Sequence, residues 1–175
     1  MYKRQGYAIA GIAAGTENGF RNAIVYMTIY AVMNIGAFSF VLLMKRGEKY
    51  IEEISELSVA SKNHPLMCFG LLTILFSLAG IPPLAGFFAK FYIFMSVIES
   101  GMFGLAIVGL VTTVVSAFYY IRIVKIMYFD ESKKPFENFK DVSIHGSLIL
   151  SSMILIAFFL YPSALNDVVS KITIF

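Results

Sequence analysis

The most regular feature of the chain is a series of apolar stretches separated by short polar segments. Residues 22–44 and 100–121 contain no charged side chain, and residues 142–166 contain only His145 as a titratable cation. A membrane-spanning helix needs about 20 mainly apolar residues. The pattern therefore predicts three transmembrane helices, over residues 22–44, 102–121 and 143–161.

A further apolar stretch, Pro65–Ile98, is too long for one helical crossing, because a helix rises only about 1.5 Å per residue. Its middle is interrupted by Gly80-Ile81-Pro82-Pro83. Proline lacks the N–H that a helix needs and disfavours helix in the residue before it. We expect two helices, over residues 65–79 and 84–98, that meet there in a tight hairpin. Gly80, Pro82, Pro83 and the nearby Gly86 are assigned a structural role.

The remaining segments complete a single membrane domain. Gly6–Thr16 is apolar but only about half as long as a span, so it predicts a partial helix. In Lys45–Asn63, isoleucine and leucine recur every three residues among glutamates, which suits a short amphipathic helix on the membrane surface. Asp130–Asp141 is expected to be an exposed loop on the opposite side from Lys45–Asn63. The predicted fold is an all-α, polytopic bundle with five full spans and one partial span.

The composition supports this class. Of the 175 residues, 58% are apolar and 14% charged, whereas about 45–50% and 25% are usual in soluble domains. So few charges would not cover a soluble surface, and the lipid bilayer is the predicted surrounding. The net charge of +3 is scattered, which argues against nucleic-acid binding and leaves the orientation undecided. One cysteine, two distant histidines and the absence of a phosphate-binding motif exclude a disulfide framework, a zinc motif and a recognisable nucleotide site.

Lys90 is the most informative residue, because it lies in an otherwise uncharged apolar stretch. A charge at the centre of a bilayer costs at least about 2.5–3.5 kcal/mol, and such residues are usually functional. The protonation of a buried ammonium group responds strongly to its surroundings, which makes Lys90 a candidate proton relay. The alternative is that Lys90 lies only about two turns into its helix and extends its ammonium group to the interface.

Other polar groups carry weaker signals. Ser77 precedes the Gly-Ile-Pro-Pro turn and is suited to satisfy a backbone carbonyl that the turn frees. Thr112, Ser116 and Tyr119 share one predicted span, where they either line a polar path or serve helix packing and the interfacial belt. Both interpretations remain open at this point.

Residues 76–92, FSLAGIPPLAGFFAKFY, resemble a signature of the antiporter-like subunits of respiratory complex I, which form one family with the Mrp-type sodium/proton antiporters. Within the family, Lys90–Tyr92, Val115–Arg122 and Lys125–Phe129 look most like the subunit N (chain 2) branch of NADH-quinone oxidoreductase. The resemblance covers essentially everything after Gln5 and corresponds to roughly the last third of such a subunit, a C-terminal fragment. Whether Tyr2–Gln5 is native stays open.

This resemblance implies a proton-translocating membrane subunit that couples electron transfer from NADH to quinone to proton pumping. By motif, Lys90 is the membrane lysine of a discontinuous helix that relays protons. The implied partners are other membrane subunits of complex I, and NADH and quinone are reached only through the complex. No cofactor is expected in this chain; flavin and iron–sulfur clusters belong to other subunits. The bacterial inner membrane is the expected location, before the mitochondrial one, with Asp130–Asp141 facing the cytoplasm. A subunit of an Mrp-type cation/proton antiporter and an inert remnant of a split gene are the alternatives.

Overall fold

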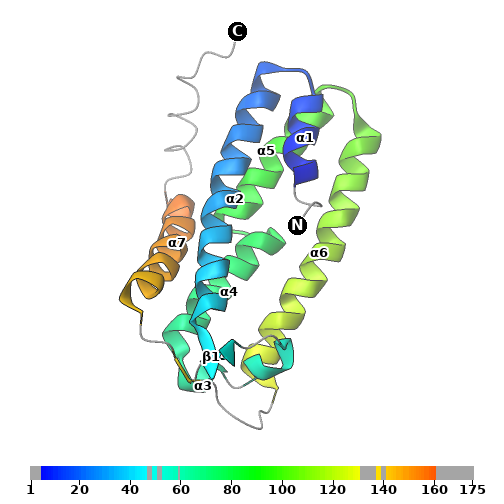
Figure 1. Cartoon of the computed structure of the whole chain (residues 1–175). Helices are drawn as coiled ribbons and strands as arrows, with labels where there is room; N and C mark the ends of the chain where they lie inside the picture. The colour runs from blue at the N-terminus through cyan, green and yellow to red at the C-terminus, as the bar shows by residue number, and fades with distance from the viewer. Residues whose placement is uncertain are drawn as a thin grey trace.

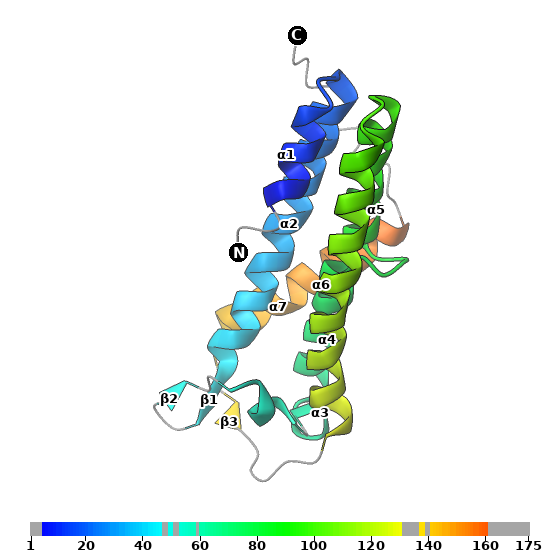
Figure 2. The ribbon, with the colours of Figure 1, turned by 90° about the vertical axis from the view of Figure 1, so that its right-hand side faces the viewer.

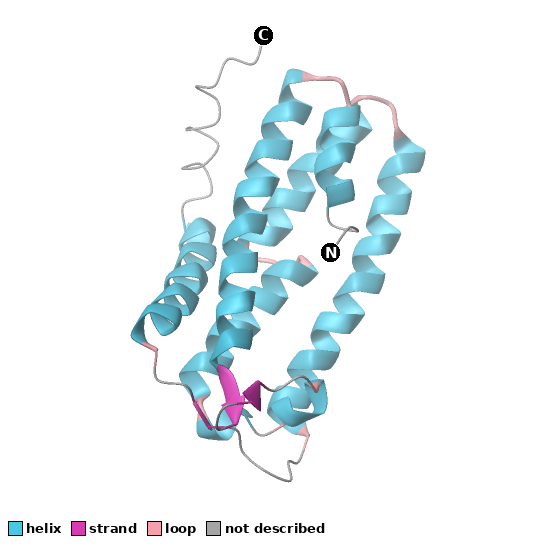
Figure 3. Ribbon diagram, in the orientation of Figure 1, coloured by secondary structure: helices cyan, strands magenta, loops and turns pink. Residues whose placement is uncertain are grey.

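A computed structural model describes residues 5–46, 49–50, 53–58, 60–130, 137–138 and 141–160. These residues form an elongated helical bundle with a small group of short strands at one end (Figure 1, Figure 3). The longer helices are α1 (Gln5–Ala13), α2 (Glu17–Leu43), α4 (Pro65–Ala79), α5 (Ala85–Glu99), α6 (Phe103–Phe129) and α7 (Val142–Leu160). These helices agree with the predicted boundaries to within a few residues, except that α2 begins earlier and α6 ends later.

The partial N-terminal helix corresponds to α1, which packs antiparallel against α2 (Figure 2). The turn between them uses Gly15, whose φ of 66° lies in the left-handed region that glycine adopts without strain. Thr16 then caps α2, because its side-chain oxygen accepts a hydrogen bond from the Gly19 N–H at 3.0 Å. This cap explains why α2 begins before the charge-free stretch does.

The expected hairpin of residues 65–79 and 84–98 is wrong. Both helices form, but α5 continues away from α4 along the bundle instead of folding back beside it (Figure 2). The loop between them lies near the middle of the bundle (Figure 3). Both halves pack against the long helices α2 and α6, which run beside the stacked pair. A proline-rich turn ends a helix equally well in either arrangement, so the packing surfaces of α2 and α6 decide its direction.

The expected placement of Lys45–Asn63 opposite Asp130–Asp141 is wrong for the same reason. Strand β1 (Met44–Arg46) pairs antiparallel with β2 (Lys49–Tyr50) on one side and with β3 (Glu137–Asn138) on the other. Lys45 lies directly opposite Glu137 in this ladder. The segments after α2 and after α6 therefore lie at the same end of the bundle (Figure 1).

The predicted amphipathic helix is shorter than expected. It is a single 3₁₀ turn, η2 (Ile54–Leu57), followed by the four-residue helix α3 (Ala60–Asn63). Leu57 is buried, but Ile54, which the sequence places on the same apolar face, is half exposed, so the predicted apolar face is buried only in part. Ile51 and most of the loop 130–141 lie outside the described residues.

Small residues bring the last helix close to the bundle. A Cβ atom at Gly36 of α2 would lie 2.8 Å from the Cβ of Ser151 in α7. The Ser152 hydroxyl, also in α7, lies 3.3 Å from the Gly70 carbonyl oxygen of α4 and 2.8 Å from the Leu148 carbonyl oxygen of its own helix. Small residues at such contacts are how membrane helices approach each other closely. They set the position of α7 against α2 and α4.

Candidate functional site

The interruption between α4 and α5 is built from a few local features. Gly80 ends α4 in the left-handed conformation, with φ 81° and ψ 38°. The backbone N–H groups of Gly80 and Ile81 both donate to the Phe76 carbonyl, at 3.1 and 3.0 Å. This pattern satisfies carbonyls that a helix end would otherwise leave unpaired. Helix α5 begins after Leu84, so Pro82 and Pro83 lie in the loop between the two helices.

Ser77 and Gly86 hold the two half-helices together. The completely buried Ser77 hydroxyl accepts a hydrogen bond from the Gly86 N–H at 3.0 Å. A Cβ atom at Gly86 would overlap the Ser77 carbonyl oxygen and lie 2.7 Å from its carbonyl carbon. Glycine at this position therefore lets α5 approach the last turn of α4. The Ser77 hydroxyl thus pairs with an N–H of α5, and the prediction that it satisfies a freed carbonyl is wrong, because the close approach of α5 supplies a donor instead.

Lys90 lies at the same junction, with 8% of its surface exposed. Its Nζ donates hydrogen bonds to the carbonyl oxygens of Leu78 at 2.9 Å and Ala79 at 3.4 Å. These carbonyls belong to the last turn of α4, where no helical N–H follows to pair with them. The C-terminal end of a helix carries a partial negative charge that stabilises a cation. The ammonium group is thus buried and held by backbone at a break in the helix.

Tyr7 of α1 is a member of the site that the sequence did not reveal. The Lys90 Nζ lies 5.5 Å from the centre of the Tyr7 ring, within the range of a cation–π interaction. The Tyr7 hydroxyl lies 2.7 Å from the Thr113 hydroxyl of α6. The sequence did not single out Tyr7, because nothing local indicates that α1 packs beside α5.

Of the four residues predicted to form a polar path, two lie close to Lys90 or Tyr7 and two do not. Ser77 lies at the junction with Lys90, and Thr112 lies 3.3 Å from the Tyr7 hydroxyl. Ser116 donates to the Thr112 carbonyl of its own helix at 2.8 Å, and Tyr119 is exposed. The path through these four residues therefore stays a prediction.

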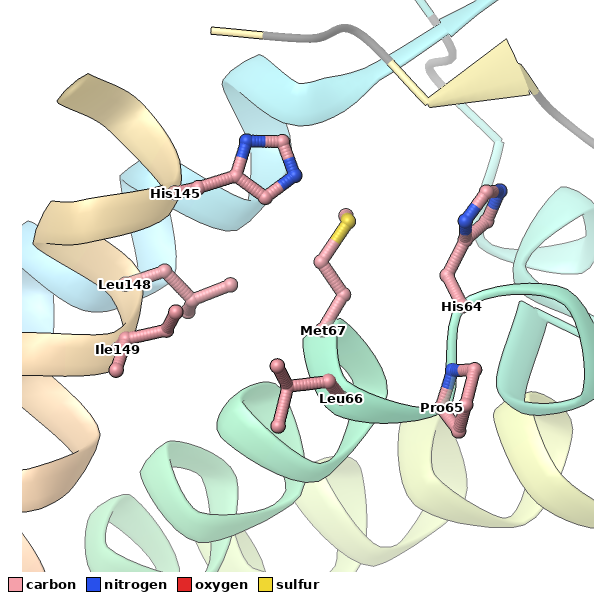
Figure 4. A pocket seen from close by; sticks show the side chains of 7 residues that line it. All are labelled: His64, Pro65, Leu66, Met67, His145, Leu148 and Ile149. Carbon is pink, nitrogen blue, oxygen red and sulfur yellow. The ribbon is translucent and has the colours of Figure 1, made fainter. Parts of the chain in front are cut away.

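The two histidines, distant in sequence, line one cavity. His64 precedes α4, His145 lies in α7, and Met67 lies between them on the wall of a 190 Å³ cavity (Figure 4). The His145 Nδ1 lies 2.8 Å from the Asp141 carbonyl oxygen. Among the described residues, no group of three or more histidine, cysteine or acidic side chains is placed to hold a metal ion.

The fold and the site together define a class of protein. Helices α2 and α6 are long and apolar enough to cross a membrane. The outer face of α6 exposes large apolar side chains such as Ile107, Val114 and Phe118, which soluble monomers rarely gather in one place. The described residues thus form a membrane-type helical bundle in which a lysine is buried at the junction of two half-length helices.

Comparison with known proteins gives the family. The family model described as "NADH:quinone oxidoreductase/Mrp antiporter, TM" matches residues 3–116, well over half of the chain. The chain therefore belongs to this family, and the resemblance seen in the sequence is confirmed. The matched region begins at Lys3, within the segment Tyr2–Gln5 whose origin the sequence left open.

Two relatives of the chain carry the name of one member of this family. NADH-quinone oxidoreductase subunit N of Pelagibacter ubique (strain HTCC1062) is 52% identical over 97% of this chain and 36% of that protein. The subunit N of Rhodospirillum rubrum is 46% identical over 93% of this chain and 33% of that protein. The chain thus spans about a third of the length of these relatives.

Solved structures agree on the fold. A chain in respiratory complex I from Thermus thermophilus with bound NADH matches with a TM-score of 0.78 and 18% identity, over 96% of this chain and 36% of that chain. A chain in the same organism's complex with bound aureothin matches with a TM-score of 0.75 and 20% identity, over 94% and 43%.

Proposed function

We propose that this chain forms the part of a proton-translocating subunit of NADH:quinone oxidoreductase in which Lys90 relays protons. The observation that carries the proposal is the buried Lys90 ammonium group, bonded to the carbonyl end of a broken helix. The names of the relatives from Pelagibacter ubique and Rhodospirillum rubrum support the enzyme complex over an Mrp-type antiporter, since both proteins are subunit N of NADH-quinone oxidoreductase.

The chemistry of the break suits a group that takes up and releases a proton. A relay needs a charged and a neutral form of similar free energy, and a change of about 1.4 kcal/mol in the surroundings alters their ratio tenfold. The carbonyls of Leu78 and Ala79 stabilise the charged form, and burial away from water opposes it. A small movement of α5 relative to α4 changes the stabilisation by these carbonyls, while Lys90 remains buried. The junction therefore couples helix position to proton occupancy.

We also infer that α4 and α5 are two halves of one membrane crossing. Each has 15 residues and is about 22 Å long, which is less than the hydrocarbon core of about 30 Å. Stacked end to end, they match the 27 residues of α2 and of α6. This arrangement puts Lys90 near the middle of the crossing, which weighs against the alternative that it reaches the interface.

The distribution of cations between the two ends of the bundle supports an orientation of the chain in the membrane. Lys45 of β1, Lys62 of α3, and Arg122 and Lys125 near the end of α6 lie toward the end of the bundle that carries the strands. Among the residues that the structure describes, Arg21 is the cation at the other end. Positively charged residues concentrate on the cytoplasmic side of membrane proteins. We propose that the strand end faces the cytoplasm, with the subunit in the bacterial inner membrane. The flavin and iron–sulfur clusters would belong to partner subunits of the complex.

The test uses a full-length subunit N that contains this sequence, assembled in its complex in bacterial membranes. Lys90→Met removes the titratable group, and Lys90→Arg keeps a charge that does not deprotonate. The matched control is Lys62→Met, at an exposed lysine of α3. Inverted vesicles receive NADH, and a pH-sensitive dye reports proton uptake while NADH oxidation and the amount of complex are measured in parallel.

We expect both Lys90 variants to pump fewer protons per NADH at an unchanged amount of complex, and the control to match the wild type. Wild-type pumping by Lys90→Met would refute the relay. Tolerance of arginine together with reduced assembly of the methionine variant would instead support an interfacial, structural lysine.

A further inference from the structure

Tyr7 is buried at the meeting point of four helices. It belongs to α1 and has 8% of its surface exposed. Its ring packs against Tyr26 of α2, with centres 5.8 Å apart, and edge-on against Phe94 of α5 at 6.0 Å. Its hydroxyl reaches α6. The aromatic contacts fix the plane of the ring, and the hydroxyl contact fixes its tip.

The hydrogen bonds at the tip have a defined direction. A threonine hydroxyl has one hydrogen to donate. Thr113 and Thr112 each direct theirs to the Gly109 carbonyl of their own helix, at 2.9 and 2.8 Å. With that hydrogen directed to Gly109, the Thr113 oxygen can accept from the Tyr7 O–H in their 2.7 Å contact. The Tyr7 hydroxyl also lies 3.3 Å from the Thr112 hydroxyl and 3.4 Å from the Gly109 carbonyl oxygen. The Tyr7–Thr113 bond ties the ring of α1 to α6.

The ring also contacts Lys90. Its centre lies 5.5 Å from the ammonium nitrogen, which also donates to the carbonyls that end α4. An aromatic ring at this distance attracts a cation more strongly when water is excluded, as it is around these buried residues. Tyr7 thus joins the ammonium group of α5 to a hydroxyl of α6.

We propose that Tyr7 is a positioning residue for the Lys90 proton relay: its ring holds the ammonium group at the helix break, and its hydrogen bond to Thr113 makes that position depend on α6. The inference rests on the proposed function of Lys90. It predicts that movement of α6 relative to α5 is transmitted to the relay through this one side chain. The aromatic ring and the hydroxyl contribute separately and can be removed separately.

The test compares substitutions in the full-length subunit within its complex. Tyr7→Phe keeps the ring and removes every contact of the Tyr7 hydroxyl. Thr113→Val removes the Tyr7–Thr113 bond from the other side, together with the Thr113 bond to the Gly109 carbonyl of its own helix. The double variant loses the Tyr7–Thr113 bond only once. Tyr7→Leu removes the ring as well. The matched control is Thr28→Val, because the Thr28 hydroxyl donates to the Ile24 carbonyl of its own helix and is exposed.

We expect Tyr7→Phe and Thr113→Val each to lower the number of protons pumped per NADH by a similar factor, roughly two- to tenfold, the range that one hydrogen bond provides. The double variant should lose less than the product of the two single losses, because the bond that both variants remove is lost only once. Tyr7→Leu should be lower still, and phenylalanine should restore part of the loss. Pumping is normalised to the amount of complex, so a variant that assembles poorly does not imitate the result.

Lys90→Met measured alongside separates two failures. If it pumps normally, the proposed function fails. If it loses pumping while Tyr7→Phe, Thr113→Val and Tyr7→Leu keep the wild-type ratio, only the positioning role of Tyr7 is overturned. Additive losses in the double variant would also contradict the inference, because they would mean that the two hydroxyls act independently.

Discussion

The contact between Gly86 and Ser77 offers the sharpest test of the broken helix, because one added methyl group meets backbone there. Gly86→Ala would overlap the Ser77 carbonyl oxygen and bring the new Cβ to 2.7 Å from its carbonyl carbon and 2.9 Å from its Oγ. Ordinary contact begins at 3.4 Å, so relief at the carbon alone requires a movement of at least 0.7 Å. The obstructing atoms are mainly backbone, which cannot rotate away as a side chain does. Helix α5 must therefore shift from the end of α4.

The energetic cost follows from the same geometry. Overpacking of a tight contact typically costs about 1–3 kcal/mol. Stretching the 3.0 Å bond between the Gly86 N–H and the Ser77 hydroxyl removes about 0.5–1.5 kcal/mol more. Alanine's better helix propensity returns up to about 1 kcal/mol. We expect a net loss of about 1–4 kcal/mol, and a displaced Lys90 because it lies one turn farther along α5.

The assay measures the thermal midpoint of the detergent-solubilised complex and the number of protons pumped per NADH. Gly104→Ala is the matched control: it also lies in the first turn of a membrane helix, but a Cβ there meets nothing within 4 Å. The control should keep both values. If Gly86→Ala behaves like Gly104→Ala, the close approach of α5 to α4 is not required and the account of the junction is wrong.

Three further predictions concern the surroundings of the site. Gly80→Ala should lower stability by about 1–2 kcal/mol, because φ is 81° at this position. The new Cβ would lie 3.3 Å from the Lys90 Nζ, so proton pumping should fall as well. Unchanged pumping at an equal amount of complex would show that the position of the ammonium group is not critical. Asn22→Ala removes hydrogen bonds to the Tyr92 carbonyl at 3.1 Å and to the Ser96 hydroxyl at 2.8 Å. The complex should lose about 1–3 kcal/mol of stability, measured as a lower thermal midpoint, whereas the control Thr28→Val should leave the midpoint unchanged. Glu53→Cys and Glu99→Cys replace exposed glutamates at opposite ends of the bundle; a membrane-impermeant maleimide should label the former in inverted vesicles and the latter in right-side-out cells, and the reverse pattern would overturn the proposed orientation.

The sequence by itself determined where the main helices lie along the chain, but not the short strands β1–β3. Helix α4 has the predicted boundaries, and α5 differs by one residue, because proline and glycine end helices through their own backbone chemistry. The membrane character follows from composition and charge-free length, which need no knowledge of packing. Lys90 was identifiable for the same reason, since a lysine in an apolar helix is unusual wherever that helix lies.

Only the tertiary structure decided how these pieces meet. The turn at Gly80–Leu84 permits either a hairpin or a stacked pair, and contacts with α2 and α6 select the stacked pair, reversing the predicted placement of one loop. The ring of Tyr7 reaches Lys90, and its hydroxyl reaches Thr113, across more than 80 residues of chain. Periodicity and propensity describe a residue and its neighbours along the chain. The partners of a buried ammonium group come instead from whichever helices pack around it, and that is a property of the whole bundle.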